Sequence, residues 1–103
     1  MQRWHIATSK SGRFSATTSR FYGTDLPRLF GMFQDPDSWP MEAPERLIRI
    51  EPEALLGYSF DNDTRVEIRF ERVRSGLFRV DLLHEQLHDE DELAACLAYW
   101  DEI

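Results

Sequence analysis

The chain has 103 residues, of which 42% are apolar and 30% are charged. These proportions are typical of a globular domain, and a chain of this length can bury about 65% of its unfolded surface. The formal net charge is −7, and residues 81–103 contain eight acidic and no basic side chains. Because such a field repels phosphate backbones, we do not expect nucleic acid as a partner.

Cysteine content and hydropathy exclude further kinds of site and further classes of protein. Cys96 is the only cysteine, which rules out an intrachain disulfide and a metal site made of several cysteines. The histidines are too scattered to predict a metal site, and no phosphate loop or nucleophile motif is present. No apolar run is long enough for a signal peptide or a membrane span. We therefore expect a cytoplasmic protein with residues 1–103 as a single domain, no membrane contact, no metal and no cofactor.

The first part of the chain predicts two strands and a helix. Turn residues Lys10–Gly12 separate a weakly alternating segment from a strand over about 14–22. A helix over about 26–34 follows, capped by Thr24 or Asp25. Its apolar residues recur at the spacing of one helical face: Leu26, Leu29, Phe30 and Phe33. The proline-rich segment after this helix is expected to be a loop.

From residue 46 onward the apolar period changes to two, as in β-strands. Short strands are expected over 47–50 and 55–60, followed by a turn at 61–63. Longer strands are expected over 65–73 and from 77 to about 84. One face of these strands is apolar and the other is charged, so the predicted sheet has one buried face and one wet face.

The loop between the two longer strands predicts how they pair. Arg74–Gly76 fits a three-residue hairpin loop with glycine in the left-handed position, which places Val73 opposite Leu77. The same register matches opposite charges on the wet face: Glu71–Arg79, Arg69–Asp81 and Arg65–Glu85. It also matches apolar residues on the other face: Ile68–Leu82 and Phe70–Val80. Loop chemistry and charge pattern therefore predict the same pairing.

A final helix is expected to begin near Asp89. Asp89 and Glu92 approximate a capping box, and the acidic first turn suits the positive end of the helix dipole. The apolar stripe of this helix consists of Leu93, Cys96, Leu97 and Trp100, with Ile103 close to it. This stripe predicts that the helix packs against the apolar face of the sheet.

Two stretches of the chain match a known family pattern. Residues 20–36 contain an arginine on the strand over 14–22, an apolar pair on the helix and a closing Asp-Pro: Arg20, Leu29-Phe30 and Asp35-Pro36. Residues 65–103 contain a paired-strand ending, an acidic helix start and a tryptophan, marked by His84-Glu85, Leu87 and Trp100. Together they resemble START-like proteins of the SRPBCC superfamily, in particular the bacterial branch similar to the activator of heat-shock-protein ATPase.

The chain departs from this pattern in three places. Thr24-Asp25 stands where the family has Ala-Pro, and Gln86 stands where the family usually has glycine. The segment between Asp35-Pro36 and the next strand is much shorter than in the family, where it includes a strand that helps to wall the cavity. The resemblance therefore implies a cavity that is smaller or open on one side. Gln2–Thr8 is a candidate to pair in place of the missing strand.

The resemblance implies an α+β helix-grip fold. In this fold an antiparallel sheet of about five to six strands wraps around the C-terminal helix, with a short helix after the first strand region and an apolar space between sheet and final helix. The residues expected to face that space are Phe60, Ile68, Phe70, Val80, Leu82, Leu97 and Trp100, and those expected at its mouth are Trp39 and Tyr58. Among them, Trp100 is the residue most expected to touch a ligand.

Three functions are considered on this basis. The leading hypothesis is binding of a small hydrophobic ligand without catalytic machinery. The alternative is a protein-interaction or co-chaperone-type regulatory module that uses the acidic C-terminal helix as its contact. Catalysis would need polar groups inside the cavity, and His84, expected at a strand end, is the only inward ionisable candidate.

Overall fold

The computed structural model describes residues 4–39, 43–60 and 62–101. Six strands and two α-helices follow one another along the chain, with a short 3-10 turn, η1, after the first helix. Their bounds are β1 (His5–Thr8), β2 (Phe14–Tyr22), α1 (Leu26–Gln34), η1 (Pro36–Ser38), β3 (Arg46–Glu51), β4 (Leu55–Ser59), β5 (Arg65–Arg74), β6 (Leu77–Leu87) and α2 (Glu90–Asp101). The predicted α+β class with five to six strands is confirmed.

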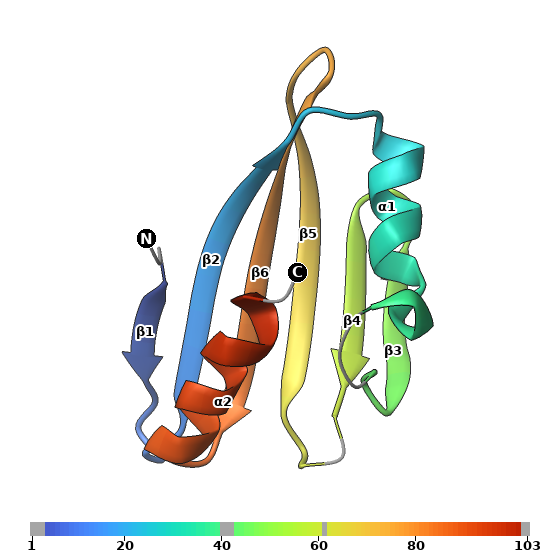
Figure 1. Ribbon diagram of the computed structural model, residues 1–103. Coiled ribbons are helices and arrows are strands. Elements are labelled where there is room, and N and C mark those ends of the chain that lie inside the picture. The colour runs from blue at the N-terminus through green and yellow to red at the C-terminus, as the bar shows by residue number, and fades with distance from the viewer. Residues whose placement is uncertain (1–3, 40–42, 61, 102–103) are drawn as a thin grey trace.

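The strands form one sheet in the order β1-β2-β6-β5-β4-β3, and all neighbouring pairs are antiparallel. Both helices lie on the same face of this sheet, α1 over the β3–β4 side and α2 over the β2–β6 side (Figure 1). The covered face carries buried apolar side chains such as Leu56, Ile68 and Leu82. The sheet therefore has one buried and one wet face, as the alternating pattern predicts.

The predicted register of β5 and β6 is confirmed over most of its length. Ile68 pairs with Leu82, and Phe70 pairs with Val80. Arg79 forms ion pairs with its predicted partner Glu71 and with its strand neighbour Asp81, while Arg69 contacts Glu67. Exposed pairs of this kind contribute about 0.2–1 kcal/mol each, so they specify the register more than they stabilise it.

The predicted end of this hairpin is wrong by one residue. The loop consists of Ser75 and Gly76 alone, and Arg74 rather than Val73 pairs with Leu77. A bulge between Arg72 and Arg74 accounts for the shift, because it leaves Val73 without a partner across the ladder. Gly76 has φ 77°, so the predicted left-handed glycine is confirmed.

Helix α1 is held by its cap and by aromatic packing. The Asp25 side chain accepts a hydrogen bond from the backbone N–H of Arg28 at 2.9 Å, which satisfies one free donor of the first turn. On its buried face, the rings of Phe30 and Phe33 lie 5.1 and 5.8 Å from the ring of Phe70, measured between centroids. The predicted apolar face of this helix is therefore the one that packs on the sheet.

Helix α2 is capped almost as predicted. The backbone N–H of Glu92 donates to Oδ1 of Asp89 at 2.8 Å. In the other direction, the Glu92 carboxylate accepts from the backbone N–H of His88, one residue before the cap, and not from that of Asp89 itself. Within the predicted stripe, Cys96 and Trp100 are buried, and Leu93 and Leu97 pack partly buried against the core. Ile103 lies outside the described residues.

The N-terminal strand β1 lies at the edge of the sheet opposite β3. β1 pairs with β2, while β3 forms the opposite edge, so Gln2–Thr8 does not replace a strand beside β3; of that segment, residues 2 and 3 lie outside the described part. A short turn is the physical reason. Ser9 and Arg13 close it through a 2.8 Å backbone hydrogen bond, and Gly12 takes φ 81° within it, so β1 folds directly back on β2.

Neither helix in the described part of the chain is long and apolar enough to cross a membrane.

Arg20 ties β2 to the end of α2. Its Nη2 donates to the backbone carbonyl of Trp100 at 2.8 Å in a partly buried position, where a cation also complements the negative end of the helix dipole.

We expect Arg20→Ala to lower the free energy of unfolding by about 1–3 kcal/mol, because a hydrogen bond to a charged group is lost. Urea unfolding followed by circular dichroism measures this. Arg28→Ala, at an exposed site on α1, is the control and should change stability by less than about 0.5 kcal/mol; equal losses in both variants would contradict the anchoring role.

Candidate ligand-binding site

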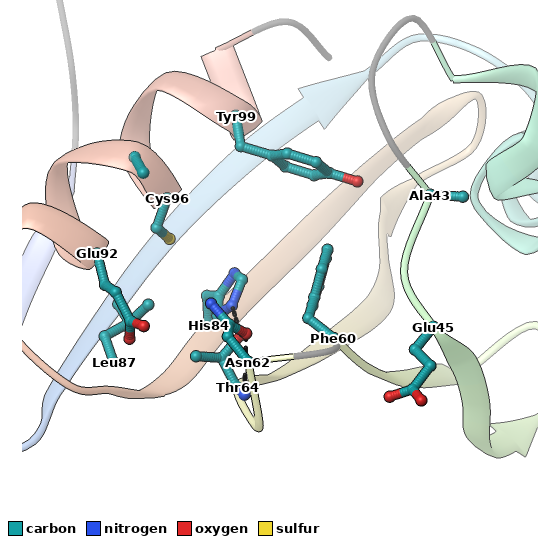
Figure 2. Close-up of a pocket in the computed structure, with 11 residues that line it drawn as sticks. Ala43, Glu45, Phe60, Asn62, Thr64, His84, Leu87, Glu92, Cys96 and Tyr99 are labelled. Carbon is teal, nitrogen blue, oxygen red and sulfur yellow. Dashed lines mark hydrogen bonds between the residues drawn. The ribbon is translucent and has the colours of Figure 1, made fainter.

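A pocket of about 450 Å³ opens between α2 and the end of the sheet where β4 turns into β5. Its walls come from four parts of the chain: the segment before β3, the β4–β5 turn, the end of β6 and one face of α2 (Figure 2). The lining residues are Ala43, Glu45, Phe60, Asn62, Thr64, His84, Leu87, Glu92, Ala95, Cys96 and Tyr99. A volume of this size is in the range of small-molecule sites.

A chain of hydrogen bonds runs from the core into the pocket wall. The indole Nε1 of Trp100, which can only donate, lies 2.9 Å from Nδ1 of His84, so Nδ1 is the acceptor. In a neutral imidazole the proton is then on Nε2, which lies 2.9 Å from Oγ1 of Thr64. Thr64 Oγ1 in turn donates to Oδ1 of Asn62 at 2.7 Å. The amide NH2 of Asn62 adds donor capacity at the pocket wall.

Burial keeps His84 uncharged. Removal of the imidazole from water lowers the pKa of His84 to about 4, and the nearby Glu92 carboxylate only partly opposes this shift. The ring is therefore neutral at physiological pH, with its tautomer set by Trp100. Both ring nitrogens already hold partners, Trp100 on one side and Thr64 on the other, which fixes the orientation of the His84 ring at the pocket wall.

Aromatic rings form the apolar part of the wall. Phe60 stacks on His84 with centroids 5.0 Å apart and an interplanar angle of 23°. Tyr99 meets Phe60 edge-on at 5.5 Å and Trp100 edge-on at 5.0 Å. Phe60 and Tyr99 are half-buried and line the pocket, whereas Trp100 is fully buried behind them. A flat apolar ligand could lie against the two half-buried rings.

A bulge in β6 brings His84 and Leu87 to the same wall. Two residues of β6, Glu85 and Gln86, lie between the partners of Ala16 and Phe14 on β2, where a regular ladder would have one. Gln86 takes φ 68°, a left-handed conformation that favours glycine. His84 and Leu87 consequently both point inward although they are three residues apart. The expectation that His84 ends its strand is wrong, because β6 continues to Leu87.

Cys96 contributes to the wall as an apolar group. Burial raises the pKa of its thiol to about 12, so the thiol stays protonated and unreactive at neutral pH. Among the residues that the structure describes, no three His, Cys, Asp or Glu side chains gather as a metal site. The described pocket wall therefore combines aromatic surface, a neutral hydrogen-bonding cluster and the carboxylates of Glu45 and Glu92.

The residues predicted to line the space divide into two groups. Phe60 lies on the pocket wall, and Trp100 supports it from behind through His84. The others lie in or against the closed core: Ile68, Phe70, Val80, Leu82, Leu97, Trp39 and Tyr58. Trp39 and Tyr58, expected at the mouth, are buried with ring centroids 5.9 Å apart, and the Tyr58 hydroxyl donates to the carbonyl of Phe33 at 2.7 Å. Helix α1 covers this part of the sheet and closes it (Figure 1).

Comparison with known proteins adds to this description. No family model and no curated protein matches the sequence. Among solved structures, CalU16 from Micromonospora echinospora superposes with a TM-score of 0.70, over 97% of this chain and 78% of CalU16, at 19% sequence identity. CalU16 has the helix-grip fold. This chain has the same helix-grip fold.

The START-like fold implied by the sequence resemblance is thus confirmed. Placement in the branch similar to the activator of heat-shock-protein ATPase stays a prediction. Within the helix-grip frame, the space between final helix and sheet is divided. Trp39, Trp100 and the aromatic residues of α1 fill one part, with 5.7 Å between the two indole centroids, and the pocket at the His84 end remains open.

Proposed function

We propose that this chain binds a small, largely apolar molecule in the pocket between α2 and the β4–β5 turn. The observation that carries the proposal is the combination of about 450 Å³ of space with half-buried Phe60 and Tyr99 on its wall. Half-buried aromatic rings beside open space gain stability when a ligand covers them, at roughly 25 cal/mol for each Å² of apolar surface removed from water. The His84–Thr64–Asn62 cluster supplies a few oriented polar atoms, as ligand sites commonly do.

A substitution at Ala95 tests this proposal. Ala95 lines the pocket from α2 yet is exposed, so a larger side chain there can occupy the space without entering the core. We expect the wild-type protein to bind N-phenyl-1-naphthylamine, an uncharged fluorophore that brightens in apolar surroundings, with a saturable titration curve. In Ala95→Phe we expect the affinity to fall at least tenfold, because the added ring takes the place of the probe.

Ala94→Phe is the matched control. It adds the same ring to the preceding residue of the same helix, at an exposed position outside the pocket lining. Its affinity for the probe should equal that of the wild type. Failure of the wild type to bind, or equal loss in both variants, would count against a ligand site at this position.

The protein-interaction alternative stays a prediction. It rests on the shortened middle of the chain and on the acidic C-terminal segment. Two of the acidic residues in that segment have structural roles: Asp89 caps α2, and Glu92 bonds to the backbone of His88. Negative charge in the first turn also stabilises the helix through its dipole. These local roles account for part of the acidity without a partner.

A further inference from the structure

The charges on the pocket wall all have the same sign. Among its described lining residues, Glu45 and Glu92 carry carboxylates, and no lysine or arginine is present. His84, the remaining ionisable base on the wall, is neutral because burial lowers its pKa to about 4. A ligand inside the pocket therefore meets negative charge that the wall itself does not balance. Figure 2 shows the two carboxylates on opposite sides of the polar cluster.

Glu92 is held in a fixed position. Its Oε1 accepts from the backbone N–H of His88, which precedes α2, and lies 2.7 Å from His88 Nδ1, a contact that becomes an ion pair when that ring is protonated. Both of these contacts are made by Oε1, and the Glu92 side chain lines the pocket. The carboxylate acts electrostatically on His84 at the centre of the wall. A charge held in place costs less ordering on binding than one on a free side chain.

The aromatic rings and the surrounding sequence add to the same field. The half-buried rings of Phe60 and Tyr99 line the pocket, and the face of an aromatic ring attracts cations. His84 and Leu87 on β6 and all the lining residues of α2 belong to the segment 81–103, which has eight acidic side chains and no lysine or arginine. An anionic ligand would enter against this field, whereas a cation would be drawn into it.

We propose that the ligand of this pocket is a cationic amphiphile, with an apolar ring body against Phe60 and Tyr99 and a protonated amine near Glu92. This inference rests on the proposed binding function and adds the charge of the ligand to it. It argues against fatty acids, aromatic carboxylates and phosphates as ligands. The polar cluster of Asn62 and Thr64 would serve a hydroxyl or carbonyl on the same ring body.

Three probes with one ring system test the charge preference: 2-naphthylmethylamine, which is protonated at neutral pH, 2-naphthylmethanol and 2-naphthoate. Affinities are measured by isothermal titration calorimetry at low salt. We expect the ammonium to bind about tenfold more tightly than the alcohol, and the carboxylate at least tenfold more weakly than the alcohol. Raising the salt concentration to about 0.5 M should shrink both differences, because ions screen partly exposed charges.

Two variants of α2 identify the source of the preference. Glu92→Gln should lower the ratio of ammonium to alcohol affinity about fivefold. Glu90→Gln removes the same charge from the same helix at an exposed residue outside the lining, and should leave that ratio as in the wild type. A ratio equally affected by both substitutions would overturn the assignment of the amine to Glu92.

The remaining outcomes separate this inference from the binding function. Naphthalene probes that bind with equal affinity, or a carboxylate that binds best, would overturn the charge preference and leave the binding function standing. If no probe of the three binds and N-phenyl-1-naphthylamine also fails, the binding function falls, and the charge preference falls with it.

Discussion

Replacement of Trp100 by alanine is expected to lower the free energy of unfolding by about 3–5 kcal/mol, the usual cost of removing a large buried aromatic side chain. Trp100 is 0% exposed and contacts the rings of Trp39, Tyr99 and His84. Small domains have only about 5–15 kcal/mol in total, so this variant would lose a large part of its stability. Urea unfolding followed by far-ultraviolet circular dichroism gives the change without relying on tryptophan fluorescence.

A milder pair of substitutions separates packing from hydrogen bonding. Trp100→Phe keeps a ring but removes the donor to His84 Nδ1, which leaves a buried acceptor unpaired at a cost of about 1–3 kcal/mol in addition to the lost volume. Trp4→Phe is the control, because the buried Nε1 of Trp4 has no hydrogen-bond partner in the described structure. Removing that N–H forfeits no hydrogen bond, so Trp4→Phe should destabilise clearly less. Equal losses would mean that the bond to His84 contributes nothing measurable.

The parts of the fold that the sequence predicts are those set by local patterns. Alternation along β5 and β6, together with glycine at position 76, predicts their pairing, because a one-residue slip would turn Ile68 and Phe70 outward. The stripe on α2 predicts its buried face, because apolar residues at helical spacing lie on one side. Both depend on neighbours within about twenty residues, and both are confirmed.

The pocket depends on contacts that no local pattern contains. Phe60 was predicted for the site, but Thr64 reaches His84, and Asn62 joins through Thr64, only because β5 and β6 lie side by side. Simple alternation assigns Leu87 to the wet face, and the bulge at Gln86 reverses that assignment. The signal in the sequence was the departure at position 86, where the resembled family usually has glycine. Glycine at this place in the resembled family is consistent with a left-handed residue, and a left-handed residue within a strand indicates a bulge.

The division of the apolar space between core and pocket also could not be predicted from the sequence. Trp39 and Tyr58 look like residues of a cavity mouth because they are large and have a polar atom. Their polar atoms are instead satisfied by backbone carbonyls of α1: Trp39 donates to Met32 and Tyr58 donates to Phe33. Burial, with a smaller contribution from Asp35, raises the pKa of Tyr58 to about 12. Both residues thus pack as core under the helix, and the open pocket lies at the His84 end.

The stability of the protein is expected to depend on pH through His84. The folded pKa is about 4 and that of an unfolded histidine is about 6.5, so between these values the unfolded chain binds more protons at this site. Stability therefore rises with pH across this window. The contribution is complete above pH 6.5 and is lost as the pH falls to about 4, with a total of about 3 kcal/mol. Urea midpoints measured from pH 4 to pH 7.5 give this curve.

Carboxylates titrate in the lower part of the same window, so the effect of His84 is obtained as a difference between proteins. His84→Gln abolishes the titration at this site, and its stability should fall less steeply with acid than that of the wild type, so that the gap between the two proteins narrows toward pH 4. His5→Gln, on the exposed strand β1, controls for loss of a histidine and should run parallel to the wild type. Nuclear magnetic resonance of the His84 ring in the folded protein supplies an independent measurement. A ring that titrates near pH 6.5, together with parallel stability curves for all three proteins, would contradict this prediction. It would show that His84 accepts a proton without opening the cluster of Trp100, Thr64 and Asn62. The description of His84 as a buried, neutral part of the pocket wall would then be wrong.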